Sequence, residues 1–179
     1  MLKYVRMLSA TALIVVASSS AAAQAHVGSD DLLIASFHAG AAHIEQVFTT
    51  SAERMPEGDY AFRPTPEVRS FAELVGHVAE SNYVFCAIMN GETAPAKPTA
   101  WAQATKAEVQ QALAESFTYC EDAILAMDGP QAQVLVRFQG REWPAAAVMN
   151  FRTYHALLHY GNVITYLRMR GLVPPSTEP

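Results

Sequence analysis

Residues 154–175 read Y-H-A-L-L-H-Y-G-N-V-I-T-Y-L-R-M-R-G-L-V-P-P, and this stretch predicts a helix with two histidines on one face. His155 and His159 are four residues apart in a long apolar run without proline, and residues i and i+4 of a helix lie one above the other. Gly171 suits a left-handed cap, and the prolines after it prevent the helix from restarting. Two imidazoles with this spacing can bind one metal ion, as in H-E-x-x-H sites. On its own, such a pair more often consists of ordinary core or surface histidines, so a third ligand is needed.

The first 25 residues have the pattern of a signal peptide. Lys3 and Arg6 form a short basic region, residues 8–17 are apolar but too few to span a bilayer comfortably, and Ala23-Gln24-Ala25 is a small-residue cleavage signal. We predict cleavage after this signal, which leaves residues 26–179 as one exported domain in a bacterial periplasm or beyond. The alternative is an uncleaved anchor. No later segment is apolar enough, for long enough, to cross a membrane.

The predicted mature chain is acidic. The leader contains two of the 12 basic residues and none of the 17 acidic ones, so cleavage changes the net charge from −5 to about −7. Nucleic-acid phosphates and anionic membrane surfaces attract basic proteins, so the charge argues against both as partners. About 154 residues are enough for one domain with a workable core.

Apolar residues recur with helical periodicity in four segments, which loops containing proline and glycine separate. Two segments begin with a capping box, in which Ser70 is followed by Glu73 and Thr105 by Glu108. Residues 131–143 are ambiguous, because alternating apolar residues and Gln139-Gly140 also fit a small hairpin. We therefore predict an all-α fold, a four-helix bundle. The predicted helices cover about residues 30–55, 70–90, 105–127 and 144–169.

His77 is the candidate for the third ligand. It lies in the middle of the second predicted helix, among apolar residues, with Glu73 and Glu80 one turn to either side. Metal ligands in a bundle project inward from facing helices, and three histidines leave coordination positions open for water or substrate. Either glutamate could accept the outward N–H of a ligating ring and fix its tautomer. The alternative for His77 is a hydrogen-bonded core histidine.

Three segments carry a family resemblance. They are F-R-P at residues 62–64, S-F-A-E-L-V-G-H-V-A-E-S-N at residues 70–82 and H-x-x-x-H-Y-G-N-x-x-x-Y-L-R-x-x-G at residues 155–171. With these segments the chain resembles the DinB-like superfamily of four-helix bundles, which also contains the bacillithiol and mycothiol S-transferases and maleylpyruvate isomerase. The resemblance covers essentially the whole mature chain. It implies a bundle with a long crossover between the second and third helices, and frequently a homodimer.

The resemblance also implies a ligand set. In that family one histidine of the second helix and two of the last hold a divalent metal, which by position are His77, His155 and His159. Many relatives have Gln where this chain has Asn162, whose amide has a shorter reach. Asn162 and Tyr166 are candidates for lining the site, although for Tyr166, seven residues after His159, packing is the favoured role.

Cys86 and Cys120 are the two cysteines of the chain, and each lies toward the end of a predicted helix. In an exported protein such a pair favours a disulfide over two buried thiols. A bond between them requires the second and third helices to be parallel. Residues 90–104 can reach roughly 50 Å when extended, which is enough to recross a helix of about 30 Å. The crossover of the superfamily is similar.

Three functions are compatible with an ion held by histidines. The first is an enzyme, a metal-dependent hydrolase or a thiol S-transferase, because an ion with open positions can polarise a carbonyl or lower the pKa of bound water or thiol. No glutamate lies between His155 and His159 to act as a base, and export counts against the thiol reaction, whose low-molecular-weight thiols are mostly cytosolic. The second is a non-catalytic periplasmic protein that binds a metal or a small ligand, and the third is a bundle with a structural metal. Imidazole ligands favour zinc or nickel, with iron as a further candidate. The sequence does not identify a small-molecule substrate or ligand.

Overall fold

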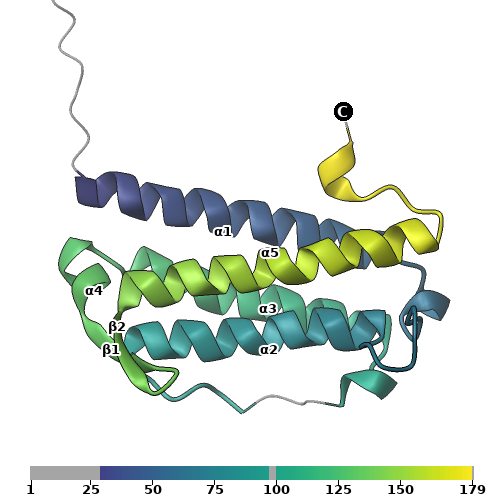
Figure 1. Cartoon of the computed structure of the whole chain (residues 1–179), viewed down its shortest axis with the longest axis horizontal. Coiled ribbons are helices and arrows are strands. Elements are labelled where there is room, and N and C mark those ends of the chain that lie inside the picture. Colours follow the sequence, from purple (N-terminus) through teal and green to yellow (C-terminus); the bar gives the residue numbers. More distant parts are fainter. Residues whose placement is uncertain (1–28, 97–99, 179) are drawn as a thin grey trace, which may run out of the picture.

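The computed structural model describes residues 29–96 and 100–178, in which four long helices pack side by side (Figure 1). These are α1 (Ser29–Arg54), α2 (Phe71–Asn90), α3 (Lys106–Leu125) and α5 (Ala145–Met169). The predicted all-α four-helix bundle is confirmed, and every boundary falls within about two residues of the expected one, the usual uncertainty of a helix end. The predicted signal peptide, residues 1–25, lies outside the described residues. Within the described ranges, no helix is long and apolar enough to cross a bilayer.

The segment between α3 and α5, which the sequence left ambiguous, forms a short helix and a small hairpin. Strands β1 (Leu135–Phe138) and β2 (Arg141–Pro144) pair antiparallel, with Gln139 and Gly140 both in the left-handed region that a tight two-residue hairpin turn requires. The short helix α4 (Gly129–Gln133) was not anticipated, because Asp-Gly-Pro reads as the end of a helix. The same Asp128 caps a new turn, since its side chain accepts a hydrogen bond from the N–H of Gln131.

Three short 3-10 helices complete the described chain. They are η1 (Glu57–Asp59), η2 (Trp101–Gln103) and η3 (Pro175–Thr177). Both predicted capping boxes form: Ser70 Oγ accepts the N–H of Glu73, and the Glu73 carboxylate accepts the N–H of Ser70. Gly171 has a φ of 74°, so the predicted left-handed cap after α5 is confirmed.

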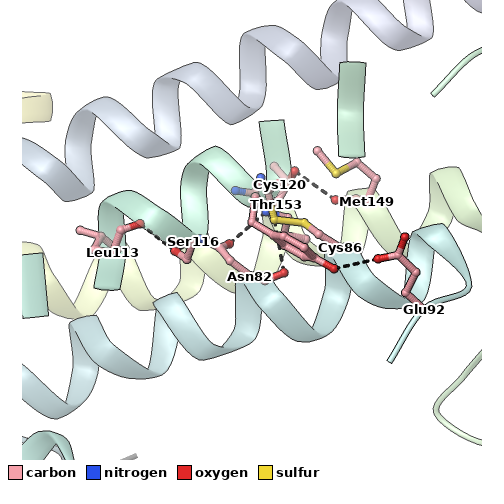
Figure 2. Close-up of a disulfide and its surroundings, with 10 residues drawn as sticks. Asn82, Cys86, Glu92, Leu113, Ser116, Cys120, Met149 and Thr153 are labelled. Carbon is pink, nitrogen blue, oxygen red and sulfur yellow. Dashed lines mark hydrogen bonds between the residues drawn. A yellow bond between two sulfur atoms is a disulfide. The ribbon is translucent and has the colours of Figure 1, made fainter. Parts of the chain in front are cut away.

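Helices α2 and α3 run parallel, and a long crossover, residues 91–105, returns the chain from the end of one to the start of the other (Figure 1). The disulfide between Cys86 and Cys120 joins them, with Cα atoms 5.4 Å apart. One turn earlier on each helix, the Asn82 amide donates a hydrogen bond to Ser116 Oγ at 3.0 Å. Figure 2 shows both links between the same two helices. The predicted disulfide and the parallel arrangement it requires are therefore present in the structure.

A buried polar network extends from the disulfide to α5. The carbonyl oxygen of the Asn82 side chain accepts a hydrogen bond from Arg152 Nε at 3.0 Å, and the Arg152 guanidinium lies 5.8 Å from the Phe117 ring centroid. Burial lowers the pKa of Arg152 to about 10, so this side chain stays positively charged at neutral pH. A buried charge of this kind needs defined partners, and Asn82 consequently links three helices at once.

The crossover is attached to α2 by one tryptophan. The indole of Trp101 lies directly over Gly76, where an added Cβ would overlap the ring, and its Nε1 donates a hydrogen bond of 2.6 Å to the Glu80 carboxylate. Gly76 and Glu80 are one turn apart and therefore lie on the same face of α2. The absence of a side chain at residue 76 is what allows the loop to approach this closely.

Reducing the disulfide should lower the free energy of unfolding by about 3–4 kcal/mol, because the bond closes a loop with a sequence separation of 34 residues. Urea unfolding curves of the oxidised and reduced protein measure this difference. A Cys86→Ala/Cys120→Ala variant is the control, because reductant should not move its midpoint. Equal midpoints for oxidised and reduced wild-type protein would contradict the prediction.

Substituting Gly76→Ala should destabilise the protein by about 1–3 kcal/mol, because the new methyl group displaces the Trp101 ring. The matched control is Gly161→Ala on α5, where nothing lies within 4 Å of the added Cβ. That substitution should stabilise by roughly 0.5–1 kcal/mol through helix propensity alone. Thermal unfolding of the two variants measures both effects, and a stabilising Gly76→Ala would show that the indole does not hold this position.

Candidate metal centre

The three histidines singled out in the sequence come together inside the bundle. His77 projects from α2, and His155 and His159 project from successive turns of α5. The Nε2 atom of His155 lies 3.2 Å from Nε2 of His77 and 3.1 Å from Nε2 of His159. One ring nitrogen from each residue lies within 4.8 Å of the other two, so the three can hold one metal ion.

The two separations measured from Nε2 of His155 suit a shared ion. Two nitrogens bound to one zinc ion at about 2.0–2.1 Å lie roughly 2.8–3.4 Å apart for angles between 90° and tetrahedral. Phe85 packs edge-on against His155, with ring centroids 5.3 Å apart, and limits the freedom of that imidazole. His159 is buried, whereas His77 and His155 are half-buried, so the centre is not sealed from solvent.

Burial keeps the three imidazoles neutral. Desolvation is the main cause that lowers the pKa of His77 and of His159 to about 4, and it also lowers the pKa of His155. The positive charge of Arg69 contributes in the same direction at all three rings. At neutral pH each ring therefore has a lone pair available for a metal.

Hydrogen bonds between the three rings cannot satisfy all of the facing Nε2 atoms. A neutral imidazole has one donor and one acceptor nitrogen, and Nε2 of His155 faces two other Nε2 atoms but can donate to only one of them. A cation satisfies all three lone pairs at once, so the donor set fits a divalent ion. In the described part of the chain, Nδ1 of His159 is buried without a hydrogen-bond partner. This ring therefore lacks the acceptor that commonly orients a metal-bound histidine.

The two glutamates considered as partners of these rings are engaged elsewhere. Glu73 closes the capping box of α2 and forms an ion pair with Arg63 at 2.9 Å. The hydrogen bond from the Ser70 backbone is the largest of several effects that lower its pKa. Glu80 accepts the Trp101 indole N–H. Both residues flank His77 in sequence, but their side chains leave the helix in other directions.

A cleft of about 680 Å³ opens beside the centre and includes His159 in its wall. Asn162 and Tyr166 also line it, and the ring of Tyr166 is at the same time buried in the core, so a role of either residue at the centre stays a prediction. The hydroxyl of Tyr166 donates a 2.6 Å hydrogen bond to the backbone carbonyl of Arg69, another residue that lines this cleft. Sequence reasoning missed Arg69; its place directly before the capping residue Ser70 was the available signal.

The other described histidines take no part in the centre. His38 and His43 lie on α1, where His38 is half-buried and His43 is exposed. Neither belongs to the three-histidine group. This agrees with their spacing of five residues, which places them on different faces of the helix.

The fold and the site define a class of protein: a four-helix bundle with a long crossover and an inward-facing group of three histidines. The comparison of sequences identifies the family. The family model of the DinB superfamily matches residues 42–163, which is more than half of the chain and includes all three histidines. The chain belongs to the DinB superfamily. Comparison with curated proteins gives no significant match.

Solved structures of low sequence identity share the fold. A DinB-like protein from Bacillus cereus ATCC 10987 superposes with a TM-score of 0.70 at 13% identity, over 81% of this chain and 97% of its own. A DinB-like protein from Bacillus subtilis gives a TM-score of 0.61 at 20% identity, over 78% and 92% of the two chains. A mycothiol-dependent maleylpyruvate isomerase gives 0.62 at 16% identity. The match covers 73% of this chain but only 60% of the isomerase, which is the longer protein.

Purified protein is expected to carry one divalent ion per chain, and His77→Ala, His155→Ala and His159→Ala should each weaken its binding. Loss of an outer partner of a ligand already costs about 10–100-fold in affinity, so loss of a ligand should cost at least that much. Elemental analysis and competition with a chelator measure the effect. His43→Ala is the matched control, because the same substitution at this exposed histidine should leave the metal content unchanged. Unchanged metal content in all three site variants would rule the centre out.

Proposed function

We propose that the protein is an exported metalloenzyme of the DinB superfamily, in which His77, His155 and His159 hold a divalent ion. The observation that carries this proposal is the convergence of three neutral imidazole nitrogens at one point beside an open cleft. Zinc or nickel suits these ligands best, with iron as a further candidate. When bound, such an ion polarises a carbonyl or lowers the pKa of a water or thiol.

The reaction class follows from what the surrounding residues supply. Glu73 and Glu80 are engaged in other hydrogen bonds, so neither acts as a base at the centre. A thiol has a pKa near 8.5 and water one near 15.7. The pKa of a thiol nucleophile therefore has to be lowered much less than that of water, and transfer of a thiol needs less help from a base than hydrolysis does. The structural similarity to a mycothiol-dependent isomerase also supports a thiol substrate. Hydrolysis is the other reaction within this proposal, because export separates the enzyme from cytosolic thiols.

Export is part of the proposal. The leader of residues 1–25 supports it, and so does the disulfide between Cys86 and Cys120, since such bonds persist in oxidising compartments. The acidic surface left after cleavage argues against nucleic acid as a partner. A homodimer, as the family resemblance implies, stays a prediction.

A second candidate is a non-catalytic protein that binds a metal or a small ligand outside the cytoplasm. Two observations favour it: Nδ1 of His159 has no hydrogen-bond partner among the described residues, and the nearest glutamates are engaged elsewhere. A centre with few supporting hydrogen bonds can bind a ligand without accelerating a reaction, because catalysis needs groups positioned for the transition state.

Metal-loaded protein should turn over at least one member of a panel of esters, amides and thiol conjugates. The activity should fall by about 10³-fold or more in His155→Ala, as expected when a group that acts on the reacting atoms is removed. His43→Ala should retain full activity. Steady-state rates with each substrate measure this, and equal rates for wild type and His155→Ala would rule the enzyme out in favour of the binding protein.

Chelation tests the third possibility, a structural metal. A catalytic or binding centre should leave a folded metal-free protein, because the disulfide and the apolar core do not depend on the ion. A structural ion supplies folding energy directly, so its removal would lower the melting temperature steeply. Circular dichroism melts with and without chelator distinguish the two cases.

A further inference from the structure

The cleft beside the histidine centre is lined by one arginine, Arg69, whose backbone is held in place and whose side chain is exposed. Arg69 lies directly before Ser70, the cap of α2, and its carbonyl accepts the hydrogen bond from Tyr166 that joins it to α5. Arg69 and His159 line the same cleft of about 680 Å³. The backbone of this arginine is therefore held between two helices, and the residue lines the same cleft as His159, a candidate ligand of the metal.

Arg69 combines two features at this end of the bundle: it lines the cleft, which Arg168 does not, and it lacks the ion pair that three neighbouring arginines form. Arg54, Arg63 and Arg170 form ion pairs with Glu178, Glu73 and Asp59 at 2.6, 2.9 and 2.6 Å. Within residues 29–96 and 100–178, the guanidinium of Arg69 forms no such pair. The charge of Arg69 also acts on the Glu73 carboxylate, but no carboxylate lies within ion-pair distance of it among the described residues, so the guanidinium is available to an anion that enters the cleft from solution.

The charge of Arg69 acts on the centre itself, because it contributes to the lowered pKa of all three histidines. Glu67 also lines the cleft, but its own carboxylate interacts locally: a hydrogen bond to Thr65 is the main cause that lowers its pKa. A divalent ion on the histidines would add to the positive potential. A negatively charged ligand is therefore favoured between the two.

The rest of the cleft wall limits the kind of anion. Pro64, Val68 and Leu74 present apolar surface, and Asn162 and Thr165 present polar groups that can hydrogen-bond a ligand. One arginine binds one carboxylate bidentately, whereas phosphate sites usually gather several donors. We propose that this cleft binds a small organic carboxylate, with the anionic group on Arg69 and the apolar body against Val68 and Leu74. The inference rests on the proposed function for the role of that ligand as a substrate.

The test uses three probes of similar shape: benzoate, its neutral amide benzamide, and phenyl phosphate. Calorimetric titration at constant ionic strength should show benzoate binding about tenfold or more tightly than benzamide, the usual preference that a charge-assisted hydrogen bond gives. Arg69→Gln should abolish this preference while leaving the metal content unchanged. Arg63→Gln is the matched control and should retain the preference, because Arg63 is already paired with Glu73.

Three results would overturn the proposal: equal binding of benzoate and benzamide or no binding of either, a preference that survives in Arg69→Gln, or phenyl phosphate binding tenfold more tightly than benzoate. The titration is repeated on metal-free protein, where the arginine should still favour benzoate. A wild-type protein that binds no metal but keeps the benzoate preference would contradict only the proposed function. A normal metal content without the preference would contradict only the carboxylate site.

Discussion

The packing of α2 against α5 is the constraint on which the candidate centre depends. His155 and His159 are neighbours on any helix, but His77 joins them only because the two helices meet in one register. Their ring nitrogens face one another at about the separation that two ligands of one ion adopt. Burial suppresses the charged forms of the rings, so bringing three imidazoles together does not require three positive charges to approach. Three neutral rings placed together in this way favour the binding of a cation from solution.

The links that fix this register lie close to the ligands. Asn82, five residues after His77, bonds Ser116 on α3 and Arg152 on α5, and Arg152 is three residues before His155. A slip of either helix by one turn would leave a buried guanidinium and a buried amide without partners, which is strongly unfavourable. The disulfide holds α2 to α3 one turn further along. The polar network around Asn82 and the disulfide therefore set the register of α2 against α3 and α5, which apolar packing alone would specify less strictly.

The sequence predicted the helices well because their ends carry local chemistry. Ser70, Thr105 and Gly171 act at helix ends, and each does so in the structure. It missed α4 because Asp128 and the residues after it fit both the end of one helix and the start of another. The sequence also does not show where side chains point. Glu73 and Glu80 flank His77, but Glu73 pairs with Arg63 and Glu80 binds the Trp101 indole. Arg69 lies in a loop without periodicity; its place before the capping residue Ser70 puts it at the start of α2, but only the folded chain brings it to the cleft that His159 lines.

The contact between Trp101 and α2 gives the molecule a built-in optical reporter. The indole rests on Gly76, directly before His77, and bonds Glu80, one turn after it. Any adjustment of that turn as an ion enters would change the surroundings of the ring and hence its emission. The second tryptophan, Trp143, packs on Phe138 in the hairpin at the opposite end of the bundle (Figure 1), so it supplies an internal reference. If binding moves that turn, occupancy of the centre would be visible in unlabelled protein as a shift in the emission of Trp101.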